Sequence, residues 1–281
     1  MNRIFIAAVL LIILTSVSVT MLIVAPYRDR SLDIIRHERP LRIGYAVEAP
    51  YAFLDASAAV TGADPELARL IAGRIGASGI EWHLLDFASL IPAIEADQID
   101  VIAAGMFITS KRSARVAFSI PTLKVTPGLL VARGNPFSLH SYKTLALRTD
   151  FRIAVLSGSS EEETLLQLGV ERRRLYPVAI AESGRMSVCS GRAGAFALSA
   201  PSIRWLGLND AQRACEIAEP FDTENSSVSF TGFAFHKNAS GLRAAWNAEL
   251  EKFIGSRDHL ELIRRFGLTG NELLHRKEPI E

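Results

Sequence analysis

Five residues in the first half of the chain are of types that can bind charged groups: Glu48, Tyr51, Phe87, Phe107 and Arg112. The aromatic residues and Glu48 follow, or lie near the end of, predicted strands, where α/β sheets place their ligand-facing loops. An aromatic face attracts a desolvated cation by about 2 kcal/mol, and a carboxylate accepts charge-assisted hydrogen bonds. Arg112, near the start of a predicted helix, can grip a carboxylate through two parallel bonds.

Each of these residues also has a structural interpretation. A single aromatic residue is more often part of a hydrophobic core, and Glu48 alone can be a solvated loop residue. Arg112 can form a surface ion pair, which contributes little to stability. We interpret the neighbouring Lys111 and Arg115 as solvated.

A second group of candidates opens a predicted helix in the middle of the chain. Ser159 and Ser160 follow a predicted strand and Gly158, and backbone N–H groups at the start of a helix suit an anionic carboxylate. Glu161, if its side chain turns toward the same site, can meet a cation instead.

The sequence lacks the motifs of the common catalytic and metal sites. It contains no HExxH, GxSxG or Walker loop and no metal-spaced Cys/His cluster, and its six histidines are scattered. We therefore expect no enzyme activity, no cofactor and no metal site. Lysine and arginine number 31 against 30 acidic residues, so no basic surface points to nucleic acid.

The pattern of strands and helices predicts an α/β fold with two units. Short β-like runs alternate with helical patterns from Leu41 onward, and Asp64-Pro65 is expected to cap the first long helix. A second unit of the same kind opens at residues 152–156. Two extended segments, near Leu130–Asn135 and Ser229–Phe235, are expected to cross between the units and form a hinge.

The N-terminal run from Ile4 to Pro26 is apolar and uncharged, which predicts entry into a membrane. Its length of roughly 20 residues favours an uncleaved anchor over a signal peptide, whose apolar core is about 7 to 15 residues long. The small residues Thr15, Ser16 and Ser18 keep the cleaved signal as an alternative. Residues 27–40 are expected to be a polar tether.

Two cysteines, Cys189 and Cys215, are too far apart in sequence for a CxxC pair. In an oxidising compartment they can form one disulfide, and two separate buried thiols are the alternative.

Several stretches of the chain resemble bacterial family 3 solute-binding proteins. They are GYAVEAPYAFLD, TGADPELARLIAGRIG, DFASLIPAIEADQIDVIAAGMFITSKRSARVAFSIP and GFAFHKN, and the resemblance covers about residues 41–268. It implies a type II periplasmic-binding-protein fold. Lobe 1 would be built from residues 41–132 plus 233–275 and lobe 2 from 133–232, after a signal or anchor segment at 1–30.

Within that family, EAPY, FASLIP, AAGMFIT, the segment Ser119–Val125 and GNPFSLHSY resemble the ectoine/hydroxyectoine-binding proteins of ABC importers. This resemblance implies a small zwitterionic ligand between the lobes, an ABC permease as partner and an extracytoplasmic or periplasmic location, tethered if the anchor is uncleaved. The implied ligand residues of lobe 1 are Glu48, Tyr51, Phe87, Gly105, Phe107 and Arg112. Lobe 2 would contribute Ser159, Ser160 and Glu161.

The stretch Gly191–Ser202 contains no acidic residue, although many amino-acid-binding relatives carry an aspartate there for the α-ammonium group. That difference argues against an ordinary α-amino acid as the ligand. Another amino acid, a betaine or a ligand-sensing role for a membrane partner remain alternatives, and a small-molecule dehydratase is a further one.

Overall fold

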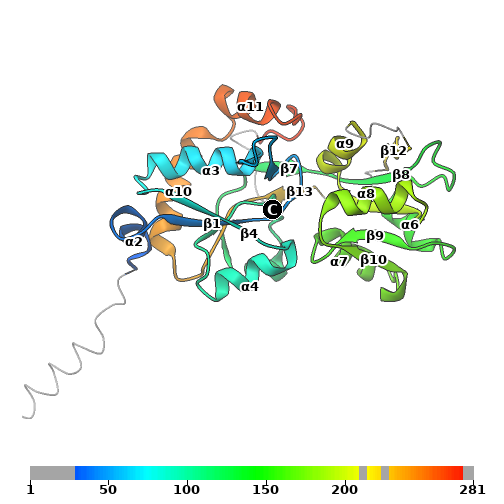
Figure 1. The fold of residues 1–281 in the computed structure, drawn as a ribbon, viewed down its shortest axis with the longest axis horizontal. Helices are drawn as coiled ribbons and strands as arrows, with labels where there is room; N and C mark the ends of the chain where they lie inside the picture. Colours follow the sequence, from blue (N-terminus) through cyan, green and yellow to red (C-terminus); the bar gives the residue numbers. More distant parts are fainter. Residues whose placement is uncertain (1–28, 209–213, 223–227, 275–281) are drawn as a thin grey trace, which may run out of the picture. The chain divides into compact units, whose positions relative to one another are not determined.

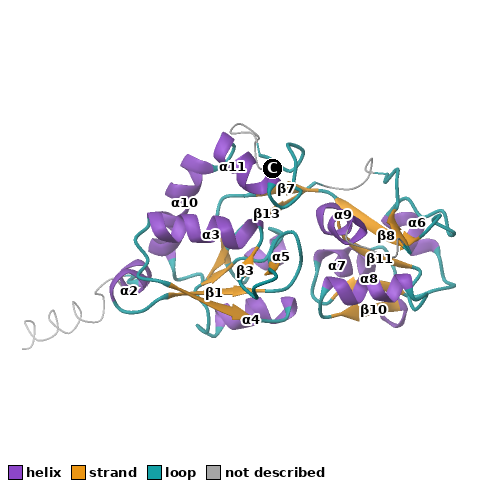
Figure 2. Cartoon of the chain, turned by 45° about the horizontal axis from the view of Figure 1, so that its top comes forward, coloured by secondary structure: helices purple, strands orange, loops and turns teal. Residues whose placement is uncertain are grey.

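The computed structural model describes residues 29–208, 214–222 and 228–274. These residues form two five-stranded sheets and two short two-stranded pairs, with helices packed around the larger sheets (Figure 1, Figure 2). The predicted α/β class is confirmed. The expected membrane segment Ile4–Pro26 lies outside the described residues, and within them no helix combines the length and the hydropathy needed to cross a bilayer.

The first sheet has the strand order β4-β1-β5-β14-β6. Its strands are β1 (Leu41–Tyr45), β4 (Ile80–Leu84), β5 (Val101–Ile102), β6 (Ala117–Phe118) and β14 (Ala234–Phe235). β1 runs parallel to β4 and β5, whereas β14 runs antiparallel to β5 and β6. Neighbouring residues of β5 enter different cores, Val101 with the residues of α3 and α10 and Ile102 with those of α4, because side chains alternate along a strand.

Helices on both sides cover this sheet. They are α2 (Ser31–His37), α3 (Ala63–Arg74), α4 (Leu90–Glu95) and α10 (Ser240–Phe253). The remaining elements of this part are β2 (Phe53–Leu54), β3 (Val60–Thr61), η1 (Phe87–Ser89), α5 (Ser110–Ser113) and α11 (Arg257–Arg264). We call this part lobe 1, residues 31–122 and 232–274.

The second sheet has the strand order β10-β9-β11-β8-β12. Its strands are β8 (Pro127–Ala132), β9 (Ile153–Leu156), β10 (Leu175–Val178), β11 (Ala195–Ser199) and β12 (Cys215–Ile217). Its helices are α6 (Tyr142–Leu147), α7 (Ser160–Gln167), η2 (Arg172–Arg174), α8 (Ala181–Cys189) and α9 (Ala200–Leu208). We call this part lobe 2, residues 127–208 and 214–222.

The chain passes between the lobes along β7 (Leu123–Val125) and β13 (Ser229–Thr231), which pair antiparallel. The predicted first crossing at Leu130–Asn135, and with it the end of lobe 1 at residue 132, is therefore placed too late. Residues 127–132 form β8, which pairs with β11 and β12 inside the second sheet. A short apolar run suits the interior of either sheet, and only its pairing partners decide between them.

The expected polar tether also differs from the structure, because residues 31–37 of it form α2. Ile35 of this helix is 1% exposed and packs in the core with α3 and α10. The backbone N–H of Leu242, in α10, donates to the hydroxyl of Ser31 at 3.0 Å. Folding thus begins about ten residues before the first strand.

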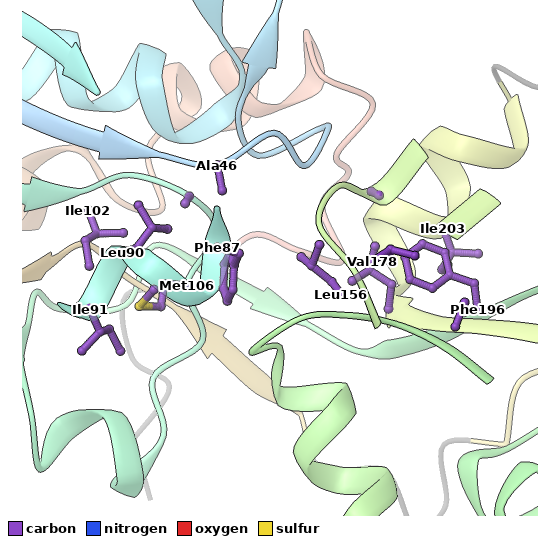
Figure 3. Packing of buried hydrophobic residues seen from close by; sticks show 14 of the residues in the cluster. Ala46, Phe87, Leu90, Ile91, Ile102, Met106, Leu156, Val178, Phe196 and Ile203 are labelled. Atoms are coloured by element: carbon purple, nitrogen blue, oxygen red, sulfur yellow. The ribbon is translucent and has the colours of Figure 1, made fainter. Parts of the chain in front are cut away.

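One hydrophobic cluster contains residues of both lobes. Figure 3 shows Phe87 between a group from lobe 1 and a group from lobe 2. The labelled members of the first group are Ala46, Leu90, Ile91, Ile102 and Met106, and those of the second are Leu156, Val178, Phe196 and Ile203. Phe87 therefore lies where the two lobes contact each other.

Cys189 and Cys215 are joined by a disulfide, with their Cα atoms 5.5 Å apart. The sequence allowed either a disulfide or two separate buried thiols, and the structure shows the disulfide. It connects the end of α8 to β12 and lies entirely within lobe 2.

Asp64 does not cap α3 as expected, because the N-cap position is Gly62 and Asp64 lies in the first turn of the helix. Its buried carboxylate instead accepts a hydrogen bond from the backbone N–H of Gly105 at 2.7 Å. Burial raises the pKa of Asp64 to about 6, against the effect of this hydrogen bond. The contact fixes the turn that follows β5, from which Phe107 and Arg112 extend.

We predict that Gly105→Ala lowers the free energy of unfolding more than Gly134→Ala does. Both glycines have positive φ, +62° and +79°, so each alanine incurs a backbone cost of about 1 kcal/mol or more. A Cβ at Gly105 would also lie 2.4 Å from Cγ of the Tyr51 ring, whereas at Gly134 nothing lies within 4 Å. We expect an additional loss of about 1 to 3 kcal/mol at Gly105, measured by urea denaturation. Equal losses in the two variants would contradict the packing of Tyr51 on this turn.

Candidate functional site

A small cavity lies where loops from the two lobes meet, and eight of the nine predicted ligand residues line it. Its volume of about 10 Å³ is roughly that needed for a single water molecule. The lining residues are Glu48, Phe87, Gly105, Phe107 and Arg112 from lobe 1 and Ser159, Ser160 and Glu161 from lobe 2. The lobes are thus closed on one another at this place.

Glu48 follows β1 in a tight turn that its backbone forms with Ala52. The side chain is buried, 6% exposed, and its Oε1 accepts a hydrogen bond from the hydroxyl of Ser202 in lobe 2 at 2.8 Å. The carboxyl group therefore belongs to lobe 1 but is held by a donor from lobe 2.

Arg112 lies in the four-residue helix α5, which Thr109 caps by accepting the N–H of Arg112. Its Nη1 donates to the carbonyl of Phe107 at 2.9 Å, and its Nη2 donates to the carbonyl of Gly158 in lobe 2 at 3.0 Å. The guanidinium also lies over the ring of Phe87, 5.4 Å from its centroid. The planar group is thus oriented by lobe 1 and turns one donor toward lobe 2, where a ligand carboxylate could take it.

The three predicted aromatic residues have different positions. Phe87 and Phe107 line the cavity, 6% and 8% exposed. Tyr51 is not among the lining residues: its ring packs on Gly105, and its hydroxyl donates to Ser199 of lobe 2 at 3.1 Å. Burial raises its pKa well above the usual value, so the phenol stays neutral. Tyr51 therefore supports the site from behind instead of offering an open face in this closed arrangement.

Lobe 2 brings the start of α7 to the cavity. Ser159 caps this helix by accepting the N–H of Glu162 at 3.1 Å, and the hydroxyl of Ser160 donates to Oε2 of Glu161 at 3.2 Å. The side chain of Glu161 turns inward and is 5% exposed. The first turn of α7 thus presents a carboxyl group, beside its N–H groups, to the cavity.

Sequence reasoning missed two serines that connect the lobes. Ser199, the last residue of β11, and Ser202, in α9, are 1% and 0% exposed and are hydrogen-bonded to each other at 3.1 Å. They contact Tyr51 and Glu48, respectively. Both lie in the stretch Gly191–Ser202, which contains no acidic residue, and the position of Ser199 at the end of a strand is the sequence signal that points to it.

Further contacts between the lobes lie outside the cavity. Arg204 of α9 pairs with Glu272, and the rings of Trp205 and Phe53 lie 5.2 Å apart. Lys111, expected to be solvated, is exposed but pairs with Glu163 of lobe 2 at 3.1 Å. The exposed Lys111–Glu163 pair contributes little by itself.

Three charged side chains are found among the described residues that line the cavity: Glu48, Glu161 and Arg112. Burial raises the pKa of Glu48 to about 8, and the neighbouring Glu161 adds to the increase, whereas Ser202 and Arg112 act against it. Burial also raises the pKa of Glu161 and lowers that of Arg112. Two carboxyl groups share one guanidinium, so one of them is expected to carry a proton near neutral pH.

The fold and the site together describe a two-lobed protein in which most of the predicted ligand residues line one cavity between the lobes. Residues 41–269 match the bacterial extracellular solute-binding proteins, family 3. The chain belongs to this family, and the predicted type II fold is confirmed.

Individual relatives fit this assignment. A probable amino-acid ABC transporter periplasmic-binding protein, y4tE, from Sinorhizobium fredii is 28% identical over 84% of this chain and 80% of that protein. The lysine/arginine/ornithine-binding periplasmic protein of Escherichia coli is 32% identical over 44% of this chain and 47% of that protein. The crystal structure of EhuB in complex with hydroxyectoine is 31% identical, with a TM-score of 0.81 over 86% of this chain and 93% of that one.

We predict that closure of the ligand-free protein weakens as the pH rises. Burial in this closed arrangement raises the pKa of Glu48 from the ordinary value of about 4.5 to about 8, so the closed form binds a proton more tightly than an open form in which the carboxyl group is solvated. The stabilisation of the closed form by proton binding at Glu48 is fully present below about pH 4.5 and is lost as the pH rises from about 4.5 to about 8. Above that pH the closed form gains or loses little further stability from this group. The radius of gyration, measured by small-angle scattering, should increase across this window.

Glu48→Gln should reduce this dependence on pH, because the amide does not titrate. Glu95→Gln, at an exposed carboxylate, is the matched control and should keep the wild-type profile. The same pH profile in all three proteins would rule out Glu48 as the titrating group.

Proposed function

We propose that this protein captures ectoine or hydroxyectoine between its lobes and delivers it, unchanged, to the permease of an ABC importer. The observation that carries the proposal is the convergence of Glu48, Phe87, Phe107 and Arg112 on one cavity between the lobes. Similarity to the hydroxyectoine complex of EhuB supports the choice of ligand.

The ligand's two charged ends have natural partners at this site. The carboxylate would bind Arg112 and take the donor that now bonds to Gly158, since a bidentate contact between charged groups is stronger than one to a carbonyl. The delocalised ring cation would lie against Phe87 and Phe107 and donate to Glu48. The cavity is too small for such a ligand in the closed arrangement, so the lobes must open before it enters.

Basic amino acids are a second candidate class of ligand. Similarity to the lysine/arginine/ornithine-binding protein supports it, and so does the presence of two carboxyl groups beside a single guanidinium among the lining residues that the structure describes. A ligand with two cationic groups and one carboxylate would match that set of charges.

The N-terminal run from Ile4 to Pro26 would keep the protein at the membrane surface while its lobes remain outside the cytoplasm. We predict an uncleaved N-terminus, which mass spectrometry of the chain purified from its native membrane would test. A mature chain that begins after the apolar run would show instead that the run is a signal peptide.

We predict that Arg112→Ala weakens ectoine binding by at least about 30-fold, equivalent to about 2 kcal/mol for a lost charge-assisted contact. Isothermal titration calorimetry on residues 31–281 measures the affinity. Arg115→Ala is the matched control. Arg115 lies three residues after Arg112, is exposed and pairs with Glu95. An Arg112 variant that is folded and binds with unchanged affinity would refute the carboxylate assignment.

A further inference from the structure

A larger cavity lies where α9 meets the start of β8, next to the segment β7 that connects the lobes. Its volume is about 440 Å³, which is within the range of small-molecule pockets. Its wall is formed by residues 126–128 and 217–221 and by Ala200 and Arg204 of α9. These described residues are all different from those that line the small cavity between the lobes. We call this cavity the hinge pocket.

The wall of the hinge pocket is mostly apolar and is held in place by its neighbours. The N–H of Ala200 donates to the carbonyl of Thr126 at 2.8 Å, which holds α9 against the start of β8. The ring of Phe221 packs edge-on against Tyr142, with the two centroids 5.7 Å apart. Ile217 adds an aliphatic side chain. A preformed apolar wall of this kind suits the body of an apolar ligand.

The guanidinium of the pocket wall, Arg204, also joins the lobes. Its Nη2 donates to Oε1 of Glu272 in lobe 1, while its side chain stays 33% exposed. Glu272 has further partners, since its Oε2 accepts the N–H and the hydroxyl of Thr269 at 2.8 and 2.7 Å. Arg204 can therefore change its partner without leaving the carboxylate of Glu272 without a donor.

The charges of the wall select the kind of ligand. Within the part of the wall that the structure describes, the charged side chains are Arg204 and Glu219. Glu219 is exposed, so its carboxylate is solvated. A guanidinium beside apolar surface can bind a carboxylate through two parallel bonds. An apolar molecule with one carboxylate matches this wall, with its body on Ile217 and Phe221 and its charge at Arg204.

We propose that the hinge pocket binds a monocarboxylate with an apolar body, such as a medium-chain fatty acid, and that the bound carboxylate replaces Glu272 at Arg204. Because the pair Arg204–Glu272 joins the lobes, this exchange removes one contact of the closed arrangement. Occupation of the pocket would thus oppose closure, whatever solute binds between the lobes. The inference does not depend on the proposed function, since neither the pocket nor this ion pair includes a residue of the small cavity.

The test measures octanoate binding by isothermal titration calorimetry on residues 31–281, which form one compact unit. For the wild type we expect a Kd at or below about 1 mM, as for a small ligand of this size. Arg204→Gln should weaken octanoate binding at least about 10-fold and 1-octanol binding less than about 2-fold, because only the carboxylate pairs with arginine. Arg192→Gln, at an exposed arginine of the same lobe outside the pocket, is the matched control and should leave both affinities unchanged.

Glu272→Gln is a second variant, which keeps the arginine and weakens its present partner. An amide competes less strongly than a carboxylate for Arg204, so octanoate should bind at least about 3-fold more tightly. Unchanged or weaker binding in this variant would overturn the proposed exchange of partners. Octanoate binding that Arg204→Gln does not affect, or that is absent in the folded wild type, would overturn the pocket itself. If Arg204→Gln does not fold, the comparison of Glu272→Gln with the wild type decides.

Discussion

In the closed arrangement the side chains of Glu48, Glu161 and Arg112 are buried together between the lobes. The other contacts of the site depend on how the cost of burying these three charges is offset. Arg112 bonds to the carbonyl of Phe107 in its own lobe and to that of Gly158 in the other, so the guanidinium keeps hydrogen bonds when it is desolvated. Glu48 and Glu161 are less well compensated, as their raised pKa values show. A buried charge without a partner costs several kcal/mol. A ligand that supplies the missing charges would therefore stabilise the closed form, and a ligand without them would not, so the same burial would both favour closure and discriminate between ligands.

The two sheets give this arrangement the rigidity it needs. Glu48 follows β1, and Gly105 and Phe107 follow β5, so these residues are anchored to neighbouring strands of one sheet. The hydrogen bond that the backbone N–H of Gly105 donates to the carboxylate of Asp64 fixes the turn that follows β5. In lobe 2, the start of α7 and the end of β11 present Glu161 and Ser199 in the same way. Because each half is built on a packed core, motion is left to the segments near β7 and β13.

Much of this could be predicted from the sequence, because the end of a strand is visible in the pattern of apolar residues. Strand ends, helix starts and the family resemblance together predicted nine ligand residues, and eight of them line one cavity. The pattern of apolar residues is insufficient where the position of a residue depends on its tertiary partners. β8 belongs to the second sheet because it pairs with β11 and β12. Asp64 accepts the N–H of Gly105 instead of capping a helix. Ser199 and Ser202 were missed because their role is to contact the opposite lobe, and a single sequence does not show which loops meet after closure.

The contacts outside the cavity bear on how closure is controlled. The ion pairs Arg204–Glu272 and Lys111–Glu163 and the ring contact of Phe53 with Trp205 join the lobes without touching the cavity. The exposed Lys111–Glu163 pair contributes about 0 to 1 kcal/mol, and an aromatic pair about 0.5 to 1.5 kcal/mol. Together they can offset part of the cost of burying the carboxyl groups but do not depend on the ligand. They therefore shift the open–closed equilibrium equally for every ligand, and under the proposed function discrimination between ligands comes from the residues that line the cavity, aromatic as well as charged.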